Sequence, residues 1–271
     1  MAMTEADGRK HHIGVKAGEV GRYVLLPGDP DRVERIAKRF DNPRFVAQRR
    51  EYVTWSGELD GVTVSCTSTG IGCPSAAIAV EELHSLGTDT FLRVGTSGSM
   101  QSHIKPGSIG VISGAIRDEG TSRHYLPLEF PAVADLDVTI ALRDAAAASG
   151  HPWHLGVAQS KDSFYGQHEP ERMPIADDLA RRWKAWMAGG AICSEMEAAT
   201  IFIVAATLRA RAGGAMLILG NPEQRPMTKD EEAACDVDRV IDASVDGLRR
   251  LIAADRARGA STTPIAMGGK A

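Results

Sequence analysis

Residues 90–98 read TFLRVGTSG, an apolar run followed at once by a Gly-Thr-Ser-Gly segment. The run 90–94 predicts a strand buried on both faces, as in the parallel sheet of an α/β protein. Arg93 stands near its end, although a buried arginine is rare unless an opposite charge meets it. Ligands of open α/β sheets bind beyond the carboxyl ends of the strands, and residues 95–98 predict a tight loop there with N–H and hydroxyl donors. The stretch therefore predicts an anion site at Arg93, and a salt bridge to a core carboxylate is the weaker alternative.

Strand and helix patterns alternate on both sides of this run. Strands are predicted at 22–27, 44–57, 61–68, 108–116, 153–159 and 215–219, and helices at 33–40, 73–87, 135–148, 176–187, 195–209 and 230–254. Asp60-Gly61 predicts a hairpin between two of the strands, and residues 161–174 predict a loop. Such alternation predicts a mainly parallel sheet covered by helices on both faces.

The composition is that of a globular protein, with 271 residues, 43% hydrophobic and 24% charged. We expect one domain over residues 11–254, with flexible tails at 1–10 and 255–271. A net charge of -4 offers no general attraction to nucleic acid or to an anionic membrane, so an anion site must be local. The four cysteines form no C-x-x-C pair and no zinc pattern. Without an apolar signal segment or a run of about 18 apolar residues, we expect a soluble, cytoplasmic protein.

Arg32 and Arg50 are two further arginines that could bind an anion. In LLPGDPDR (25–32), Asp29 fits a helix N-cap and Pro30 the first helical position, which puts Arg32 where the helix dipole disfavours a cation. A bound anion would reverse that sign, and a solvated arginine paired with a nearby acidic residue is an equally good interpretation. Arg50 lies on a predicted strand and, taken alone, is a surface charge. No Walker loop or G-x-G-x-x-G fingerprint supports a nucleoside triphosphate or NAD.

The loop KDSFYGQHEPERM (161–173) combines two adjacent aromatic residues with the polar residues Lys161, Gln167, His168 and Arg172. An aromatic face can hold a planar ring while polar groups read its edge, and this combination suits a heterocyclic ligand. A polar surface loop pinned by one buried aromatic residue is the alternative, which the spacing alone favours.

The segment SEMEAAT (194–200) has an explanation that needs no ligand. Ser194 and Glu197 fit a capping box at the start of a helix. Glu195 and Glu197 would point to different sides of that helix, so one can cap while the other binds. A carboxylate suits the two hydroxyls of a ribose, but the motif alone is weak support for that role.

Taken in order, five motifs resemble the nucleoside phosphorylase-I superfamily, and within it the uridine phosphorylase family. They are LPGDPDRV (26–33), RREY (49–52), STGIGCPSAAIAVEELHSLGTDTFLRVGTSG (68–98), KDSFYGQHEPE (161–171) and SEMEAAT (194–200). The resemblance covers residues 11–252 and implies one α/β domain whose mixed central sheet is partly barrel-like. It implies reversible phosphorolysis of uridine to uracil and α-D-ribose 1-phosphate, with inorganic phosphate as co-substrate and no organic cofactor. It also implies a homohexamer built as a trimer of dimers, with no nucleic-acid or membrane partner.

The resemblance assigns roles to individual residues. Phosphate would be bound by Gly28, Arg32, Arg93 and Thr96 of one subunit and by Arg50 of a neighbour, the three arginines being the catalytic groups; ribose by Glu195, Met196, Glu197 and a neighbour's His12; and the base by Phe164 with Lys161, Gln167 and His168. Glu51, Ile71 and Ser75 match positions that in some members hold a monovalent cation, often potassium (K+), between subunits.

The chain departs from the family pattern in two places. The commoner uridine phosphorylases read uracil with a Gln and an Arg two residues apart, but no Arg follows Gln167 at that spacing, and the loop is similar to a subfamily that uses a Lys and a His. Whether Lys161 and His168 or Gln167 and Arg172 read the base stays open. The segment LGNPEQR (219–225) lacks both the Asp of purine phosphorylases and the Arg of many uridine phosphorylases, and its Asn221-Pro222 favours a pyrimidine.

Three other functions fit the same fold. These are a purine nucleoside phosphorylase, a phosphate-independent nucleosidase and a non-catalytic nucleoside-binding protein. The sequence also leaves open whether deoxyuridine and thymidine are substrates.

Overall fold

The computed structural model describes residues 3–222 and 225–264. Its strands are β1 (Tyr23–Leu26), β2 (Asp41–Arg49), β3 (Tyr52–Leu59), β4 (Val62–Thr67), β5 (Thr90–Ser99), β6 (Ile109–Asp118), β7 (Ala132–Val133), β8 (Trp153–Lys161), β9 (Cys193–Glu195) and β10 (Arg211–Gly220). Its α-helices are α1 (Asp31–Ala37), α2 (Cys73–His84), α3 (Leu136–Ala148), α4 (Phe164–His168), α5 (Ala176–Ala188), α6 (Ala198–Thr207), α7 (Lys229–Ala234) and α8 (Asp238–Ala257). Short 3₁₀ turns lie at Thr121–His124 and Pro170–Arg172.

The strands of the described residues form one sheet in the order β10-β6-β8-β9-β5-β1-β4-β3-β2, with β7 beside β6. Because β10 also pairs with β5, the first five strands close into a ring, and the others extend from β5 as an open sheet. The sheet contains parallel pairs such as β1–β5 and antiparallel pairs such as β3–β4. The α/β class and the mixed, partly barrel-like sheet are confirmed, whereas the mainly parallel sheet is wrong.

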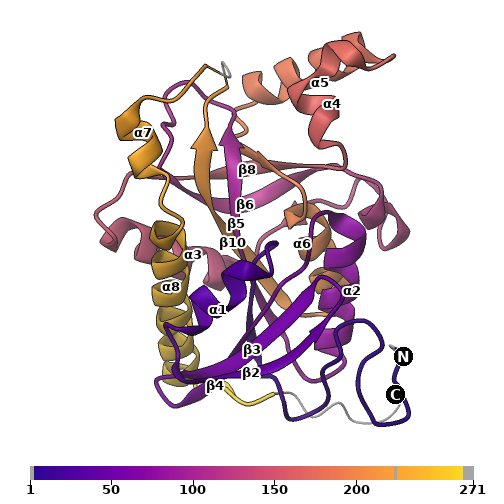
Figure 1. Cartoon of the computed structure of the whole chain (residues 1–271), viewed down its shortest axis with the longest axis vertical. Helices are drawn as coiled ribbons and strands as arrows, with labels where there is room; N and C mark the ends of the chain where they lie inside the picture. The colour runs from indigo at the N-terminus through magenta and orange to yellow at the C-terminus, as the bar shows by residue number, and fades with distance from the viewer. Residues whose placement is uncertain (1–2, 223–224, 265–271) are drawn as a thin grey trace.

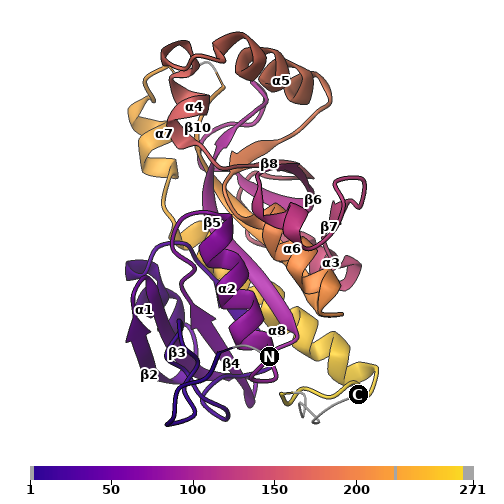
Figure 2. The ribbon, with the colours of Figure 1, turned by 90° about the vertical axis from the view of Figure 1, so that its right-hand side faces the viewer.

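Helices cover the sheet on two sides (Figures 1 and 2). One apolar core contains buried residues of α2 and α6, and a second contains those of α1, α3 and α8. Strand β5 serves both cores, since Phe91 belongs to the first and Leu92 and Val94 to the second. This is the alternation expected of a strand buried on both faces, and it confirms the prediction for residues 90–94.

Two long predicted elements are each divided in the structure. The strand predicted at 44–57 is the antiparallel pair β2–β3, and Arg50 lies in the turn between them with a positive φ of 55°. No glycine marks that turn, so nothing in the local sequence signalled it. The helix predicted at 230–254 is α7 and α8, because the backbone leaves the helix at Cys235 and the Asp236 carboxylate accepts the N–H of Asp238. The hairpin at Asp60-Gly61 is confirmed, with positive φ at both residues.

Other element boundaries shift less. The predicted loop 161–174 contains α4 and a 3₁₀ turn, and the helix predicted from 195 begins at Ala198, after the short strand β9. The domain limits 11–254 stay a prediction; of the expected tails, residues 1–2 and 265–271 lie outside the described residues. Residues 3–10 include a β-bridge between Thr4 and Lys10.

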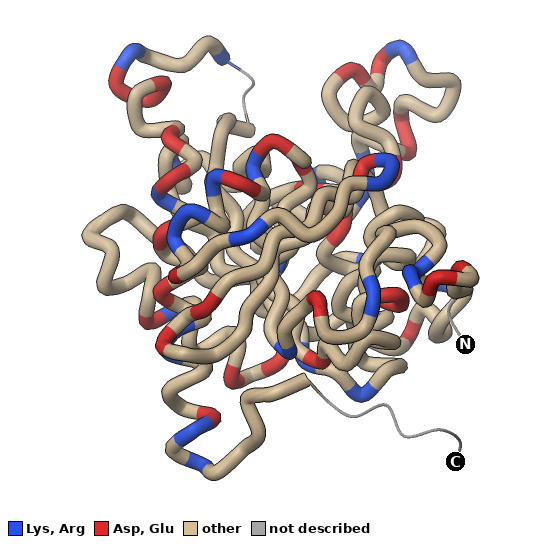
Figure 3. Tube along the Cα trace, turned by 60° about the horizontal axis from the view of Figure 1, so that its bottom comes forward, with Lys and Arg blue, Asp and Glu red and all other residues tan. Residues whose placement is uncertain are grey.

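Charges of both signs are interspersed along the chain, in keeping with the small net charge (Figure 3). Among residues 3–222 and 225–264, no helix combines the length and apolarity needed to cross a membrane.

A buried carboxylate ties the last helix to the sheet. Asp255 of α8 is 1% exposed and accepts hydrogen bonds from Tyr23 Oη on β1 at 2.7 Å and from both terminal nitrogens of Arg211 on β10 at 2.7 and 3.0 Å. Burial alone would raise the pKa of Asp255, but the hydrogen bonds from Arg211 and Tyr23 outweigh it and hold the pKa at about 2. The folded state therefore favours the charged form of this carboxylate.

Replacing Asp255 with Asn should lower the free energy of unfolding by about 3 kcal/mol, because Arg211 loses its buried partner. The matched change Asp246→Asn on the same helix removes an exposed pair with Arg250 and should cost less than about 0.5 kcal/mol. Denaturant unfolding at equal protein concentration measures both. The Asp255 contribution should be complete above about pH 4 and be lost as pH falls through about 2. Equal losses in the two variants would contradict the importance of the buried pair.

Candidate active site

Arg93 lies on β5 and is 5% exposed. Its Nη2 donates to Glu197 Oε2 at 2.5 Å and its Nη1 to the carbonyl oxygen of Leu26 at 3.3 Å. Its Nε lies 3.9 Å from Glu195 Oε2 and has no hydrogen-bond partner within the described residues. The core carboxylate of the salt-bridge interpretation is thus present, but it satisfies only part of the guanidinium.

The tight loop predicted at 95–98 is wrong. These residues continue β5 as far as Ser99, paired with β10 and, at Gly98, with β9. Gly95 does not form a turn; its lack of a side chain leaves room for two neighbours. A Cβ there would lie 2.5 Å from Met216 Sδ and 3.2 Å from Arg93 Nη2. Thr96 is therefore a half-buried residue of an extended strand, opposite Leu217.

Arg32 lies in the first turn of α1, as predicted, although the helix begins one residue later than expected, with Pro30 as N-cap. The Asp29 carboxylate still accepts the N–H of Asp31 at 3.0 Å. The Arg32 side chain is 14% exposed, and its nearest carboxylate oxygen, on Asp29, is 3.9 Å away. Burial and then the charge of Arg93 lower the pKa of Arg32. Two guanidinium groups therefore repel each other at the end of the central strands, where an anion would stabilise both.

Gly28 lies beside the guanidinium group of Arg93. A Cβ on Gly28 would be 3.3 and 3.5 Å from Arg93 Nη1 and Nη2, so a larger residue would crowd the guanidinium. Gly28, Arg32 and Arg93 thus come together within one subunit.

Glu195 and Glu197 have separate tasks at the start of α6. The Glu195 carboxylate accepts the N–H groups of Glu197 and Ala198 at 2.8 to 3.0 Å and so caps the helix. Burial and then the charge of Glu197 raise the pKa of Glu195. Glu197 accepts the N–H of Gly72 at 2.7 Å through Oε1 and the Arg93 hydrogen bond through Oε2. Met196, between them, is half-buried.

The predicted capping box of Ser194 with Glu197 is wrong. Ser194 lies on β9, where its Oγ receives a hydrogen bond from Lys161 Nζ at 2.8 Å and lies 2.6 and 2.8 Å from the amide oxygens of Gln159 and Gln167. Because β9 places Ser194 before the helix, Glu195 is the residue in position to cap.

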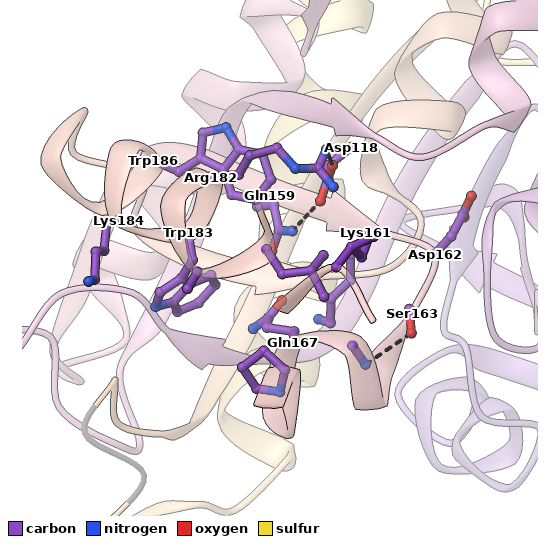
Figure 4. Close-up of a pocket in the computed structure, with 15 residues that line it drawn as sticks. Asp118, Gln159, Lys161, Asp162, Ser163, Gln167, Arg182, Trp183, Lys184 and Trp186 are labelled. Atoms are coloured by element: carbon purple, nitrogen blue, oxygen red, sulfur yellow. Dashed lines mark hydrogen bonds and ion pairs between the residues drawn. The ribbon is translucent and has the colours of Figure 1, made fainter. Parts of the chain in front are cut away.

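Two of the polar residues predicted to read a base line a cavity of about 380 Å³ between β8 and helices α4 and α5 (Figure 4). Lys161 and Gln167 line it, and Lys161 is buried at the end of β8. Burial lowers the pKa of Lys161. Burial and then the charge of Lys161 lower the pKa of His168, whose ring lies 4.3 Å from the half-exposed ring of Phe164. Arg172 instead forms an ion pair with Glu169 at the surface.

Gln159, which the sequence did not predict as a site residue, is 2% exposed and also lines the cavity. Its Nε2 donates to Asp118 Oδ2 at 2.8 Å, and Arg182 of α5 donates to the other oxygen of Asp118 at 2.6 Å (Figure 4). These partners come from three distant parts of the chain, and Gln159 alone reads as one polar position in a strand. No local signal could have found it.

His12 lies away from Arg93, and Arg50 is not among the charges that act on Arg32. His12 contacts Glu82, ten residues along α2 from Gly72 and so about 15 Å from the end that meets Glu197. Arg50 is exposed in the β2–β3 turn. Within one subunit, neither residue joins the Arg32 and Arg93 pair.

Glu51, Ile71 and Ser75 do come together near the start of α2. A Cβ on Gly70 would lie 2.7 Å from Glu51 Cγ and 3.5 Å from Ser75 Oγ, and the adjacent Ile71 is 80% exposed. Residues 3–222 and 225–264 contain no group of three or more His, Cys, Asp or Glu side chains that could hold a metal ion. A cation here would depend on carbonyl and hydroxyl oxygens beside the single carboxylate.

The family model described as "Phosphorylase superfamily" matches residues 22–253. The chain belongs to this superfamily. It is 47% identical to the uridine phosphorylase of Treponema pallidum (strain Nichols), over 92% of this chain and 96% of the relative. It is 40% identical to the uridine phosphorylase of Escherichia coli (strain K12), over 89% and 97%, and 38% identical to the guanosine phosphorylase of Halorubrum lacusprofundi, over 90% and 99%. The resemblance to nucleoside phosphorylases is confirmed.

Phosphate or sulfate at about 100 times its dissociation constant should raise the melting temperature by about 5 °C, because the anion relieves the repulsion between Arg32 and Arg93. Arg32→Gln should lose most of this increment. The matched control Arg35→Gln, on the same helix, removes a surface arginine paired with Asp236 and Asp238 and should keep it. Differential scanning fluorimetry measures the increment, and an equal increment in wild type and Arg32→Gln would place the anion elsewhere.

Proposed function

We propose that this protein is a uridine phosphorylase, a pentosyltransferase that reversibly converts uridine and phosphate to uracil and α-D-ribose 1-phosphate. The observation that carries the proposal is the pair of buried guanidinium groups, Arg32 and Arg93, beside the Glu197 carboxylate. The full-length similarity to several uridine phosphorylases supports the choice of substrate. A role in pyrimidine salvage and nucleoside catabolism in the cytoplasm would follow.

The proposed mechanism relies on orientation and charge. Phosphate bound by Gly28, Arg32, Arg93 and Thr96 lies below C1′ of the ribose. As the C1′–N1 bond breaks, its electron pair leaves with uracil, and positive charge grows on the sugar. The bound dianion stabilises that charge, and one of its oxygens then forms the new bond to C1′. The nucleophile is already charged, so the enzyme's main contribution is to hold it in position.

The ribose would be held at the start of α6. Glu197 is oriented by Arg93 and the Gly72 N–H, and its oxygens are placed to accept the 2′- and 3′-hydroxyl protons. Met196 would pack against the sugar. Glu195 would act by fixing the helix start through its cap, so its contact with ribose would be indirect.

The base would lie between Phe164 and the cavity. Lys161 has polar partners in Ser194 and the Glu195 carbonyl oxygen, and its remaining N–H can meet the charge that develops on a uracil oxygen. With a lowered pKa, His168 is neutral at pH 7 and would bind the ring edge by hydrogen bonding without a charge. The surface pairing of Arg172 favours Lys161, His168 and Gln167 as the readers of uracil.

The remaining predicted residues would act across subunit interfaces. In a homohexamer built as a trimer of dimers, Arg50 would complete a neighbour's phosphate site and His12 would reach its ribose 5′-hydroxyl. The partial exposure of the His12 side chain and the exposure of Arg50 in the β2–β3 turn are consistent with that arrangement. Glu51, Ile71 and Ser75 would hold a monovalent cation such as K+ at the interface.

A purine nucleoside phosphorylase is the second candidate, because one relative with similar coverage is a guanosine phosphorylase. Initial rates with uridine, deoxyuridine, thymidine, inosine and guanosine, each with and without phosphate, separate the two. We expect uridine to be the best of the five and phosphate to be required. Turnover without phosphate would identify a nucleosidase, and binding without turnover a nucleoside-binding protein.

Arg93→Ala should lower kcat/KM for uridine phosphorolysis by at least about 100-fold, because a charge fixed on the phosphate is lost. Circular dichroism should show that the variant keeps its secondary structure. Near-normal activity in a folded Arg93→Ala enzyme would remove the central assignment.

Lys161→Met should lower kcat on uridine by about 100-fold, since the methionine keeps the stem of the side chain but removes the donor that stabilises the leaving uracil. The control Lys184→Met changes an exposed lysine of α5 at the cavity rim and should leave kcat near wild type. Ultraviolet absorbance follows the reaction, and unchanged kinetics in Lys161→Met would move base recognition to Gln167 and His168.

A further inference from the structure

Glu82 is a buried carboxylate in the middle of α2, 3% exposed. Within the described residues, its carboxylate hydrogen bonds go to residues 12 and 13 of the N-terminal segment. Its oxygens accept the backbone N–H of His12 at 3.1 and 3.2 Å and that of Ile13 at 2.9 Å. Its Oε1 also lies 2.7 Å from His12 Nδ1. One carboxylate therefore fixes both the backbone and the ring of His12.

The surroundings of Glu82 decide which nitrogen of His12 carries a proton. Backbone N–H groups of two residues point at the carboxylate, and its contact with Nδ1 is short, so the ionised, acceptor-only form fits. Nδ1 must then be the donor. In the neutral ring this leaves Nε2 unprotonated, as an acceptor on the opposite edge of the imidazole. The His12 side chain is 29% exposed, although the His11 ring packs against it with ring centroids 4.7 Å apart, so part of the imidazole can meet a partner outside the subunit.

We propose that Glu82 is a positioning residue for the sugar contact: it holds His12 in the Nδ1–H tautomer so that Nε2 accepts the ribose 5′-hydroxyl proton in the neighbouring subunit's site. The inference rests on the proposed function, which supplies the ribose. Buried carboxylates behind functional histidines commonly set the tautomer and the ring orientation in this way. Burying a carboxylate is costly, and a role in holding His12 explains why this position of α2 is not apolar.

The Glu82→Gln substitution tests the tautomer while keeping the side-chain size. The NH₂ group of the introduced amide cannot accept a hydrogen bond, so it must face either a backbone N–H or His12 Nδ1. Facing Nδ1, it would favour the Nε2–H tautomer, which cannot accept the 5′-hydroxyl proton; facing the backbone, it would displace the segment.

The readout is the ratio of kcat/KM for uridine to kcat/KM for 5′-deoxyuridine, which lacks only the 5′-hydroxyl. Wild type should prefer uridine, and both His12→Ala and Glu82→Gln should lower the ratio about tenfold, the loss expected for one hydrogen bond. The double variant should show no further loss, because the two residues act as a unit. Glu82→Asp withdraws the carboxylate from Nδ1 and should also lower the ratio, which provides a second variant if Glu82→Gln does not fold.

Glu81→Gln is the matched control on the same helix, since the Glu81 side chain interacts with Tyr125 and the substitution should leave the ratio unchanged. A loss in Glu82→Gln that is equal for the two substrates would overturn the inference and leave Glu82 a purely structural residue. An unchanged ratio in His12→Ala, in an enzyme that phosphorolyses uridine, would overturn the inference but not the proposed function. Failure of wild type to phosphorolyse uridine would reject the proposed function itself.

Discussion

A guanidinium that is 5% exposed on the central strand must be neutralised where it stands, and Glu197 does this for Arg93 at 2.5 Å. Strand β5 pairs with β1, β9 and β10, so the backbone of Arg93 is fixed where the closed ring joins the open sheet. Removing two charges from water costs several kcal/mol per ion, and the pair recovers this only through close hydrogen bonding. One such pair therefore sets the position of the neighbouring elements.

The second guanidinium makes the arrangement more than a structural salt bridge. The single negative charge of Glu197 is already paired with Arg93, so it does not also neutralise Arg32. At Arg32, burial and then the charge of Arg93 outweigh the opposite effect of Asp29, and this favours binding of a small anion. Stability and affinity are opposed here, because the fold tolerates two neighbouring guanidinium groups and an anion gains from both. Glu195 lies 3.9 Å from Arg93 Nε and caps α6, but burial and then the charge of Glu197 raise its pKa, which weakens its compensation of the guanidinium charges.

The sequence was informative where a residue type conflicted with its local pattern. An arginine in an apolar strand and another at a helix N-terminus were each anomalous alone, and the fold places them within electrostatic reach of each other. The mixed, partly barrel-like sheet was predicted from the family resemblance. The alternation of strand and helix patterns alone predicted a mainly parallel sheet. Periodicity could not show that β5 continues through residues 95–98, because Gly95 and Gly98 are typical of a loop. The close approach of Met216 and Arg93 to Gly95 is a tertiary feature that the local sequence does not show. The roles of Gln159 and Glu82 could not be predicted either, because their hydrogen-bond partners lie far away in the chain. The cap by Glu195 depends on the helix starting at Ala198, later than the sequence pattern suggested.

A crystal structure of the protein grown with phosphate tests the central claim most directly. The account predicts a tetrahedral anion between the guanidinium groups of Arg32 and Arg93, within hydrogen-bond distance of both and beside Gly28. Guanidinium groups that turn away from each other, with phosphate absent from the space between them or bound only at the surface, would contradict it.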